Sequence, residues 1–86
     1  MKISKGGYKL TLPDKPWQIN DIAVNKGVMK IYVLKRSFDD IMSMLNQGSL
    51  QGVPVFYGRK GRSIFLWPRA SEDMEIEICY TILKKA

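Results

Sequence analysis

The chain has 86 residues, of which 45% are hydrophobic and 26% are charged, and its formal net charge is +6. This length fits a single domain spanning residues 1–86, and the apolar content is that of a folded protein rather than a disordered chain. The apolar runs are much shorter than the roughly 20 residues that a membrane span needs, so we expect no membrane contact.

The first half of the chain is predicted to hold two strands and a segment of mixed pattern. Residues 8–12 alternate in polarity, as a half-buried strand does, and residues 1–9 are expected to form an extended arm or an edge strand. Residues 17–24 fit a short strand or a turn of helix equally well. Residues 28–34 are rich in β-branched and aromatic side chains, and because apolar residues fall on both faces we expect a central or helix-covered strand.

A short helix is predicted to begin after Ser37, a residue type that caps helix N-termini well. The apolar residues that follow recur at helical spacing and form one stripe, which includes Ile41 and Leu45. Gly48 lies where a glycine commonly ends a helix. We therefore expect Ile41 and Leu45 to face the core.

Three strands are predicted after the helix. The first two, over residues 55–57 and 62–67, are joined by a hairpin tip at 58–61, and the third alternates from residue 74 to 82. The resulting fold class is α+β: an antiparallel β-meander, sandwich-like, with one short α-helix inserted before the last three strands. Its structural core is expected to contain Trp67, Ile78 and Tyr80 packed against the helix, although Trp67 and Leu66 face opposite ways and one of them could be exposed instead.

The residue types exclude several kinds of catalytic and metal site. The sequence has no histidine and one cysteine, Cys79, which excludes histidine-based triads and zinc sites built from histidine or several cysteines. Glu75 and Glu77 lie on one face of the last predicted strand, where pairing with basic neighbours explains them better than a catalytic carboxylate pair. We therefore predict no enzyme activity, no cofactor and no metal.

The predicted hairpin tip carries three basic residues, Arg59, Lys60 and Arg62. Such a tip can contact nucleic-acid phosphates without reading sequence, or it can simply keep the surface solvated. Aromatic residues lie close by in the sequence, and aromatic side chains exposed beside cations stack on bases in single-strand binders. Within strands, however, they more often pack in the core.

The order of short motifs along the chain resembles that of a phage protein family. It reads Leu12-Pro13-Asp14, then Gly52-Val53-Pro54 with Tyr57, then Ile64-Phe65-Leu66-Trp67-Pro68, and last Ile76-Glu77-Ile78-Cys79-Tyr80. This succession, over residues 12–82, resembles the β-rich core of the head-to-tail adaptor and tail-hub (connector) proteins of short-tailed bacteriophages. The chain departs from that family in having a single predicted helix, and in having Arg69-Ala70-Ser71 where a second proline is usual.

The resemblance implies a virion structural protein, a component of a phage head–tail junction or tail ring, located in the virion after synthesis in the bacterial host. The strand edges at both ends of the predicted meander also favour a homo-oligomer, which in a virion would contact other virion proteins. In a ring around DNA, a basic tip that points inward would contact the duplex without reading its sequence, whereas an outward tip would only keep the surface solvated. We expect deletion of residues 1–9 to abolish assembly and leave the domain folded. The alternative is a small basic nucleic-acid-binding domain without catalysis, and a host-directed toxin is a third hypothesis.

Overall fold

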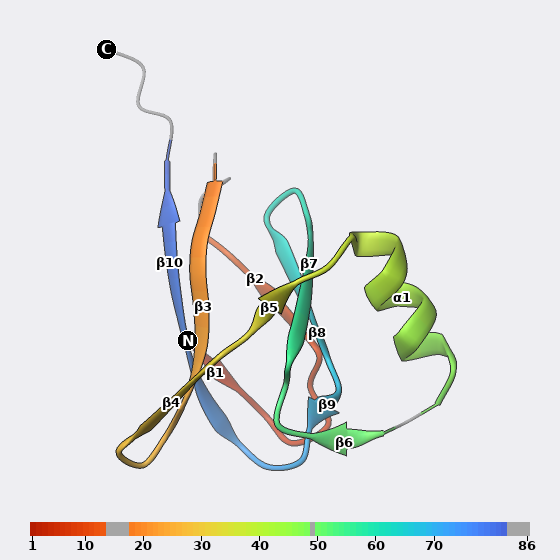
Figure 1. The fold of residues 1–86 in the computed structure, drawn as a ribbon, viewed down its shortest axis with the longest axis horizontal. Coiled ribbons are helices and arrows are strands. Elements are labelled where there is room, and N and C mark those ends of the chain that lie inside the picture. The colour runs from red at the N-terminus through yellow and green to blue at the C-terminus, as the bar shows by residue number, and fades with distance from the viewer. Residues whose placement is uncertain (14–17, 49, 83–86) are drawn as a thin grey trace.

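Two four-stranded sheets and a short helix make up the fold, which a computed structural model describes over residues 1–13, 18–48 and 50–82 (Figure 1). The α+β class predicted from the sequence is confirmed. The hairpin tip, the place of residues 28–34 and the side chain of Trp67 differ from the predictions. Asp14 and Trp17 lie outside the described residues.

The first sheet has the strand order β1-β10-β3-β4, and all its neighbours are antiparallel. Its strands are β1 (Lys2–Ile3), β10 (Met74–Thr81), β3 (Gln18–Lys26) and β4 (Met29–Tyr32). The ambiguous segment over residues 17–24 is therefore mostly strand. The last strand, β10, pairs with β1 and β3 and not with the strand before it in the sequence.

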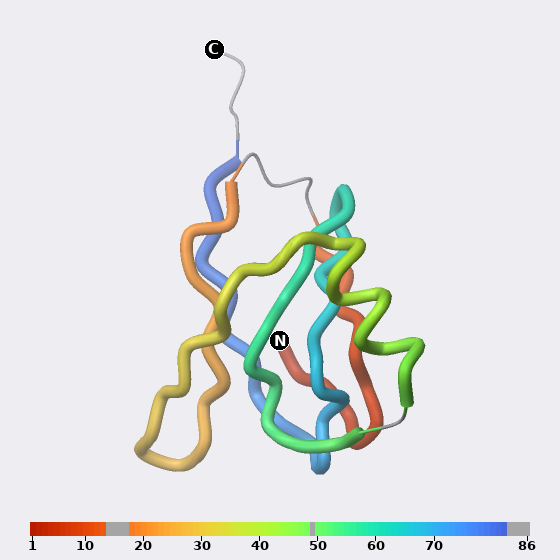
Figure 2. Tube along the Cα trace, turned by 45° about the vertical axis from the view of Figure 1, so that its right-hand side comes forward, coloured from red at the N-terminus to blue at the C-terminus, as the bar shows by residue number. Residues whose placement is uncertain are grey.

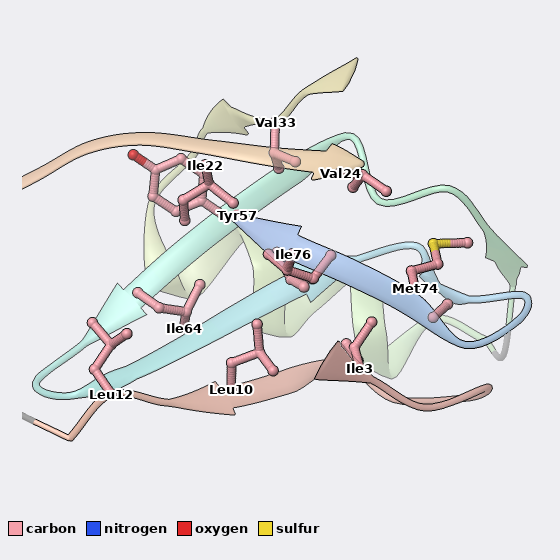
Figure 3. Packing of buried hydrophobic residues seen from close by; sticks show 12 residues of the cluster. Ile3, Leu10, Leu12, Ile22, Val24, Val33, Tyr57, Ile64, Met74 and Ile76 are labelled. Atoms are coloured by element: carbon pink, nitrogen blue, oxygen red, sulfur yellow. The ribbon is translucent and has the colours of Figure 1, made fainter. Parts of the chain in front are cut away.

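The second sheet has the order β2-β8-β7-β5, with an antiparallel core and a parallel pair between β5 and β7. Its strands are β2 (Lys9–Thr11), β8 (Ser63–Trp67), β7 (Phe56–Lys60) and β5 (Leu34–Lys35). Two short strands, β6 (Gln51–Gly52) and β9 (Arg69–Ala70), form a separate parallel pair. The sheets face each other across the core (Figure 3).

Both long hairpins turn through a glycine. Gly27 has φ 62° between the paired residues Lys26 and Met29, and Gly61 has φ 60° between Lys60 and Ser63. A two-residue turn with positive φ only at its first central residue is a type II′ turn, which favours glycine there. The tip was predicted at residues 58–61, but β7 continues to Lys60 and the turn is Gly61–Arg62.

One continuous segment passes from the first sheet to the second. It forms β4 at the margin of the first sheet, turns inward at the buried Val33, and continues as β5 at the margin of the second (Figures 1 and 2). The backbone N–H of Val33 donates to Ile22 of β3, and that of Leu34 donates to Val55 beside β7. Residues 28–34 were predicted to be central or covered, which is wrong: both of their faces are apolar although β4 is an edge strand.

The core lies between the two sheets and draws side chains from both (Figure 3). In β2, β8 and β10 the buried residues alternate with more exposed ones, as expected when one sheet face is covered. The buried cluster consists of Ile3, Leu10, Leu12, Ile22, Val24, Val33, Tyr57, Ile64, Leu66, Ala70, Met74 and Ile76. Ile78 and Tyr80 are partly buried and pack against it.

Trp67 does not belong to this core, contrary to the prediction. On β8, Ile64 and Leu66 point inward and have no exposed surface, so Phe65 and Trp67 occupy the opposite, outer face and are only partly buried. Trp67 instead stacks on Phe56 of β7, with ring centroids 6.2 Å apart. The strand alternation that buries Leu66 is the physical reason for this exposure.

Helix α1 (Phe38–Asn46) covers part of this outer face. Ser37 caps it as predicted, accepting a hydrogen bond at Oγ from the Asp40 backbone N–H (3.1 Å). Ile41 and Leu45 are buried, but under the helix rather than between the sheets. The helix lies close because β7 has glycine at position 58: a Cβ there would sit 2.9 Å from Ile41 Cγ1.

Residues 1–9 are an edge strand and a connection, not a free arm. Ile3 is buried in the core, and its strand β1 pairs with Glu75 and Met74 of β10. The Met1 ammonium donates to the Ile76 carbonyl (2.7 Å). Deleting this segment would therefore remove part of the folded core.

Candidate interaction surfaces

The three basic residues of the predicted tip lie at one end of the β7–β8 hairpin, but their side chains do different things. Arg62 Nε donates to the Leu12 carbonyl (2.8 Å), while the Leu12 N–H donates to the Arg62 carbonyl (2.8 Å), so Arg62 ties the end of β2 to the hairpin. Arg59 Nε donates to the Gly61 carbonyl (3.0 Å). Contact of this tip with DNA stays a prediction. Arg62 also has a structural role, because it bonds to the backbone at the end of β2.

Lys60, the third of these residues, belongs to a larger arrangement on the outer face of the second sheet. Its Nζ lies 5.1 Å from the ring centroid of Phe38, at the start of α1. The Phe38 ring meets Phe65 of β8 edge-on at 5.1 Å, and Phe65 stacks with Tyr8 at 6.4 Å. We call Phe38, Phe65 and Tyr8 the aromatic row.

Two further cations lie over the aromatic row. Lys9 of β2 is the strand partner of Phe65, so both side chains share the outer face, and its Nζ is 5.7 Å from the Phe65 ring centroid. The Arg69 guanidinium is 4.2 Å from the Tyr8 ring centroid. The three rings come from three different parts of the chain. Each ring is partly buried, and each lies within cation–π distance of a basic side chain.

A hollow of about 480 Å³ adjoins one end of the row. Phe38 lines it together with Lys35, Arg36 and Arg59. No carboxylate is among the described residues that line it, and Asp39 and Asp40 follow Phe38 in the first turn of α1. Nearby, the Arg36 guanidinium also lies over the Phe56 ring, 4.6 Å from its centroid. The outer face of the second sheet thus combines aromatic rings with cations.

Carboxylates gather on the other sheet. The strands of the second sheet contain no acidic residue, whereas β10 carries Glu75 and Glu77 on its exposed face. Glu77 accepts from Lys30 (3.0 Å), and this hydrogen bond, with the Lys30 charge, holds the pKa of Glu77 below its ordinary value. The Met1 ammonium is 3.3 Å from Glu75. Both carboxylates therefore pair with cations, as their spacing suggested.

Tyr57 lies close to the basic tip in the sequence, but its side chain is not on the outer face of the second sheet. Its side chain is buried between the sheets (Figure 3). This burial, with a smaller effect of the Asp21 charge, raises the pKa of its phenol above the ordinary value. Tyr57 is a core residue, which is the more frequent role of aromatics in strands.

The segment from Val28 to Leu34 forms a second candidate surface, which we call the free edge. The β3–β4 hairpin projects from the rest of the fold (Figures 1 and 2). Val28 lies in its turn, between the paired residues Lys26 and Met29, and is fully exposed. Met29, Tyr32 and Leu34 are exposed as well. Among the described residues no strand pairs with the outer side of β4 or β5. Large apolar side chains therefore line an unpaired strand margin.

Within residues 1–13, 18–48 and 50–82, no three potential ligands among histidine, cysteine and acidic side chains come together. In the same ranges, no helix has the length and apolar composition needed to cross a bilayer.

Sequence reasoning missed both the aromatic row and the free edge. The signal for the row was available, since Phe65 alternates with two aliphatic residues on a short strand and must lie on the other face. Its contact with Phe38 and Tyr8 depends on strand pairing and helix docking, which no local pattern contains. No protein-family model matches the chain, and no curated protein matches it.

Proposed function

We propose that this chain is a virion structural protein, a component of a phage head–tail junction or tail ring, whose copies join through the free edge. The observation that carries the proposal is that this edge is both unpaired and apolar. Strand margins in monomeric proteins are usually kept short, charged or covered, because an open margin pairs with other chains. Here the exposed side chains are mainly large and apolar.

The backbone of the free edge is also available for pairing. The N–H of Val33 is bonded to Ile22, and bonds alternate along an antiparallel ladder, so the backbone groups of Lys30 and Tyr32 point away from β3. A strand from another copy can bond to these groups while its side chains cover Met29 and Leu34. Such pairing buries apolar surface and, at the same time, gives the unpaired backbone groups of the edge hydrogen-bond partners.

A second open margin lies on the opposite side of the same sheet. Among the described residues, β1 and Met1 cover β10 only as far as Ile76. Beyond it, a hollow of about 350 Å³ is lined by Ile78 and Tyr80 of β10 and by Leu12 and Pro13. Contact between two different margins is heterologous, and it produces a ring when the rotation between copies closes. The sequence resemblance to connector proteins supports a ring in a virion.

The test compares two substitutions of equally exposed leucines. Leu34→Glu places a charge in the free edge, where the side chain is 62% exposed, and Leu50→Glu places it outside the edge, at 60% exposure. Native mass spectrometry and sedimentation velocity, over a range of concentrations, report the number of copies. We expect a closed oligomer for the unmodified chain and for Leu50→Glu, and monomers for Leu34→Glu with an unchanged circular dichroism spectrum.

A monomer at all concentrations for the unmodified chain contradicts the proposal. So does a folded Leu34→Glu protein that assembles as the unmodified chain does. A symmetric dimer, or an open filament in place of a closed ring, contradicts the proposed ring. In that case the free edge still stands as the contact between copies.

A further inference from the structure

We infer that the aromatic row and the cations over it bind single-stranded nucleic acid. This surface includes Lys60 and Arg59 of the basic tip singled out in the sequence, but it is centred on the aromatic row, and the inference does not depend on assembly through the free edge. It rests on three observations: where charge is neutralised, how the rings are held, and what lies at the end of the row.

Among the residues that the structure describes, the cations in salt bridges lie on or beside the first sheet. On the first sheet, carboxylates pair with Met1, Lys26 and Lys30. On the second, Lys9, Lys60 and Arg69 lie over rings, and within the described residues no carboxylate reaches salt-bridge distance of them. A ring attracts a cation through its quadrupole but carries no net charge, so the positive potential remains. This face therefore attracts a polyanion.

The rings are positioned before a ligand arrives. Phe65 is fixed by the alternation of β8, Phe38 is fixed at the start of α1 by the close packing of the helix on Gly58, and Tyr8 stacks on Phe65. Stacking on rings that are already ordered costs little conformational entropy. The ligand that fits this face has π-surfaces as well as negative charge, and single-stranded nucleic acid has both along its length.

The hollow at the Phe38 end extends the same chemistry. Lys35, Arg36 and Arg59 line it, so a backbone whose bases lie on the row would carry a phosphate towards this cationic end. At the other end, Arg69 lies over Tyr8. With cations at both ends and rings between them, this face forms an extended binding site that suits a chain of several nucleotides rather than a single small ligand.

A single strand is favoured over a duplex because the bases of a duplex already stack on one another. Their faces are closed to the rings, and only phosphate contacts would remain. None of the row's contacts reads a base edge, so we expect tolerance of sequence. The preference for unpaired strands separates this inference from general attraction of DNA to a basic protein.

The first experiment removes charge from one face or the other. Lys9, Lys60 and Arg69 are replaced together by Ser, and the control replaces Lys2, Lys26 and Lys30, which also lowers the net charge by three. Fluorescence anisotropy with a labelled oligo-dT, the same length of oligo-U, and a duplex measures binding from low to moderate salt. For the row variant we expect weaker binding and a slope of log K against log[salt] smaller by about 2, from roughly 0.7 per lost contact.

The second experiment removes a ring without changing charge. Tyr8→Leu deletes a stacking surface of the row, and Tyr32→Leu deletes an exposed tyrosine of the first sheet. We expect Tyr8→Leu to weaken single-strand binding by about 5-fold or more, since stacking on one aromatic residue contributes that much, and Tyr32→Leu to have little effect. Thermal melting establishes that each variant is folded.

Three results would overturn the inference. They are no binding of single strands at low salt, equal binding of duplex and single strands, and equal losses for the two charge variants. A preference for oligo-U or for oligo-dT identifies RNA or DNA as the ligand and supports the row in either case. Oligomeric state, measured on the same samples, tests the proposed assembly separately.

Discussion

At the level of single residues, the neighbours Leu66 and Trp67 show how the molecule divides its apolar side chains. Leu66 lies between the sheets with no exposed surface, whereas Trp67 lies on the outer face against Phe56. The larger side chain is the less buried one. At this pair, size and hydrophobicity do not decide which side chain enters the core. The face of β8 on which each residue lies decides it.

We expect Leu66→Ala to destabilise the fold by about 2–5 kcal/mol, because it leaves a cavity in a closed interior. Trp67→Ala should cost less, because solvent and neighbouring side chains can occupy the space that it vacates. Urea unfolding followed by far-ultraviolet circular dichroism measures both. Equal costs, or a larger cost for Trp67→Ala, would show that the outer face contributes as much as the core.

Among the secondary-structure elements, α1 is the one whose position depends most on a single backbone site. It packs against β7 and β8, and it closes on Gly58 so tightly that an added Cβ would also come within 3.0 Å of Phe38 Cα and 3.1 Å of the Ser37 carbonyl oxygen. The helix and the strand can approach this closely only where the side chain is absent. Moving α1 would also move Phe38 away from Phe65.

Gly58→Ala should therefore destabilise the protein by about 1–3 kcal/mol, the usual cost of forcing extra volume into a packed contact. Gly48→Ala is the matched control, since nothing lies within 4 Å of a Cβ there and its φ is not positive. That change should be neutral or stabilising by up to about 1 kcal/mol. Chemical denaturation compares the two, and equal stability of both variants would mean that the helix shifts without cost.

The elements themselves were largely predictable from local pattern, and their pairing was not. Alternation in residues 74–82 predicted β10, and Ser37 with the apolar stripe predicted α1. Nothing local indicates that β10 pairs with β3, more than 50 residues earlier in the chain. The same limit explains why residues 28–34 were predicted to be covered. Apolar side chains on both faces are found in buried strands and also in edge strands that pair with another chain, and the local pattern does not distinguish the two.

The basic tip illustrates the limit at the candidate site. Arg59, Lys60 and Arg62 are adjacent in sequence, but a strand places alternate residues on opposite faces, and Arg62 bonds to a carbonyl of β2. The aromatic row, by contrast, assembles residues from positions 8, 38 and 65. A surface composed of such distant residues becomes visible only when the sheets and the helix are placed together.

At the scale of the whole molecule, the N-terminal residues join the first sheet by pairing with its last strand, β10, and they contribute to the common core. Ile3 is 3% exposed in the common core, and β1 covers the start of β10. Sequence alone indicated that these residues could be removed without unfolding the domain. The burial of Ile3 and the pairing of β1 with β10 indicate the opposite.

Deletion of residues 1–9 should therefore lower thermal stability sharply, and Ile3→Ala alone should cost about 2–5 kcal/mol. Lys2→Ala, an exposed neighbour on the same short strand, should change stability by no more than about 0.5 kcal/mol. Differential scanning calorimetry distinguishes these cases. A deletion variant that melts like the unmodified chain would restore the segment as a dispensable arm.

Under the proposed assembly, the segment that passes from β4 into β5 would link stability to protein concentration. Because this segment is the margin of both sheets, a copy that pairs along it would hold the two layers in fixed relation and would bind the folded state alone. Mass action then raises the melting temperature as protein concentration rises. Dilution would thus raise the unfolded fraction of the chain as well as separate the subunits, and a chain newly made at low concentration would be less resistant to proteases than one already built into an assembly.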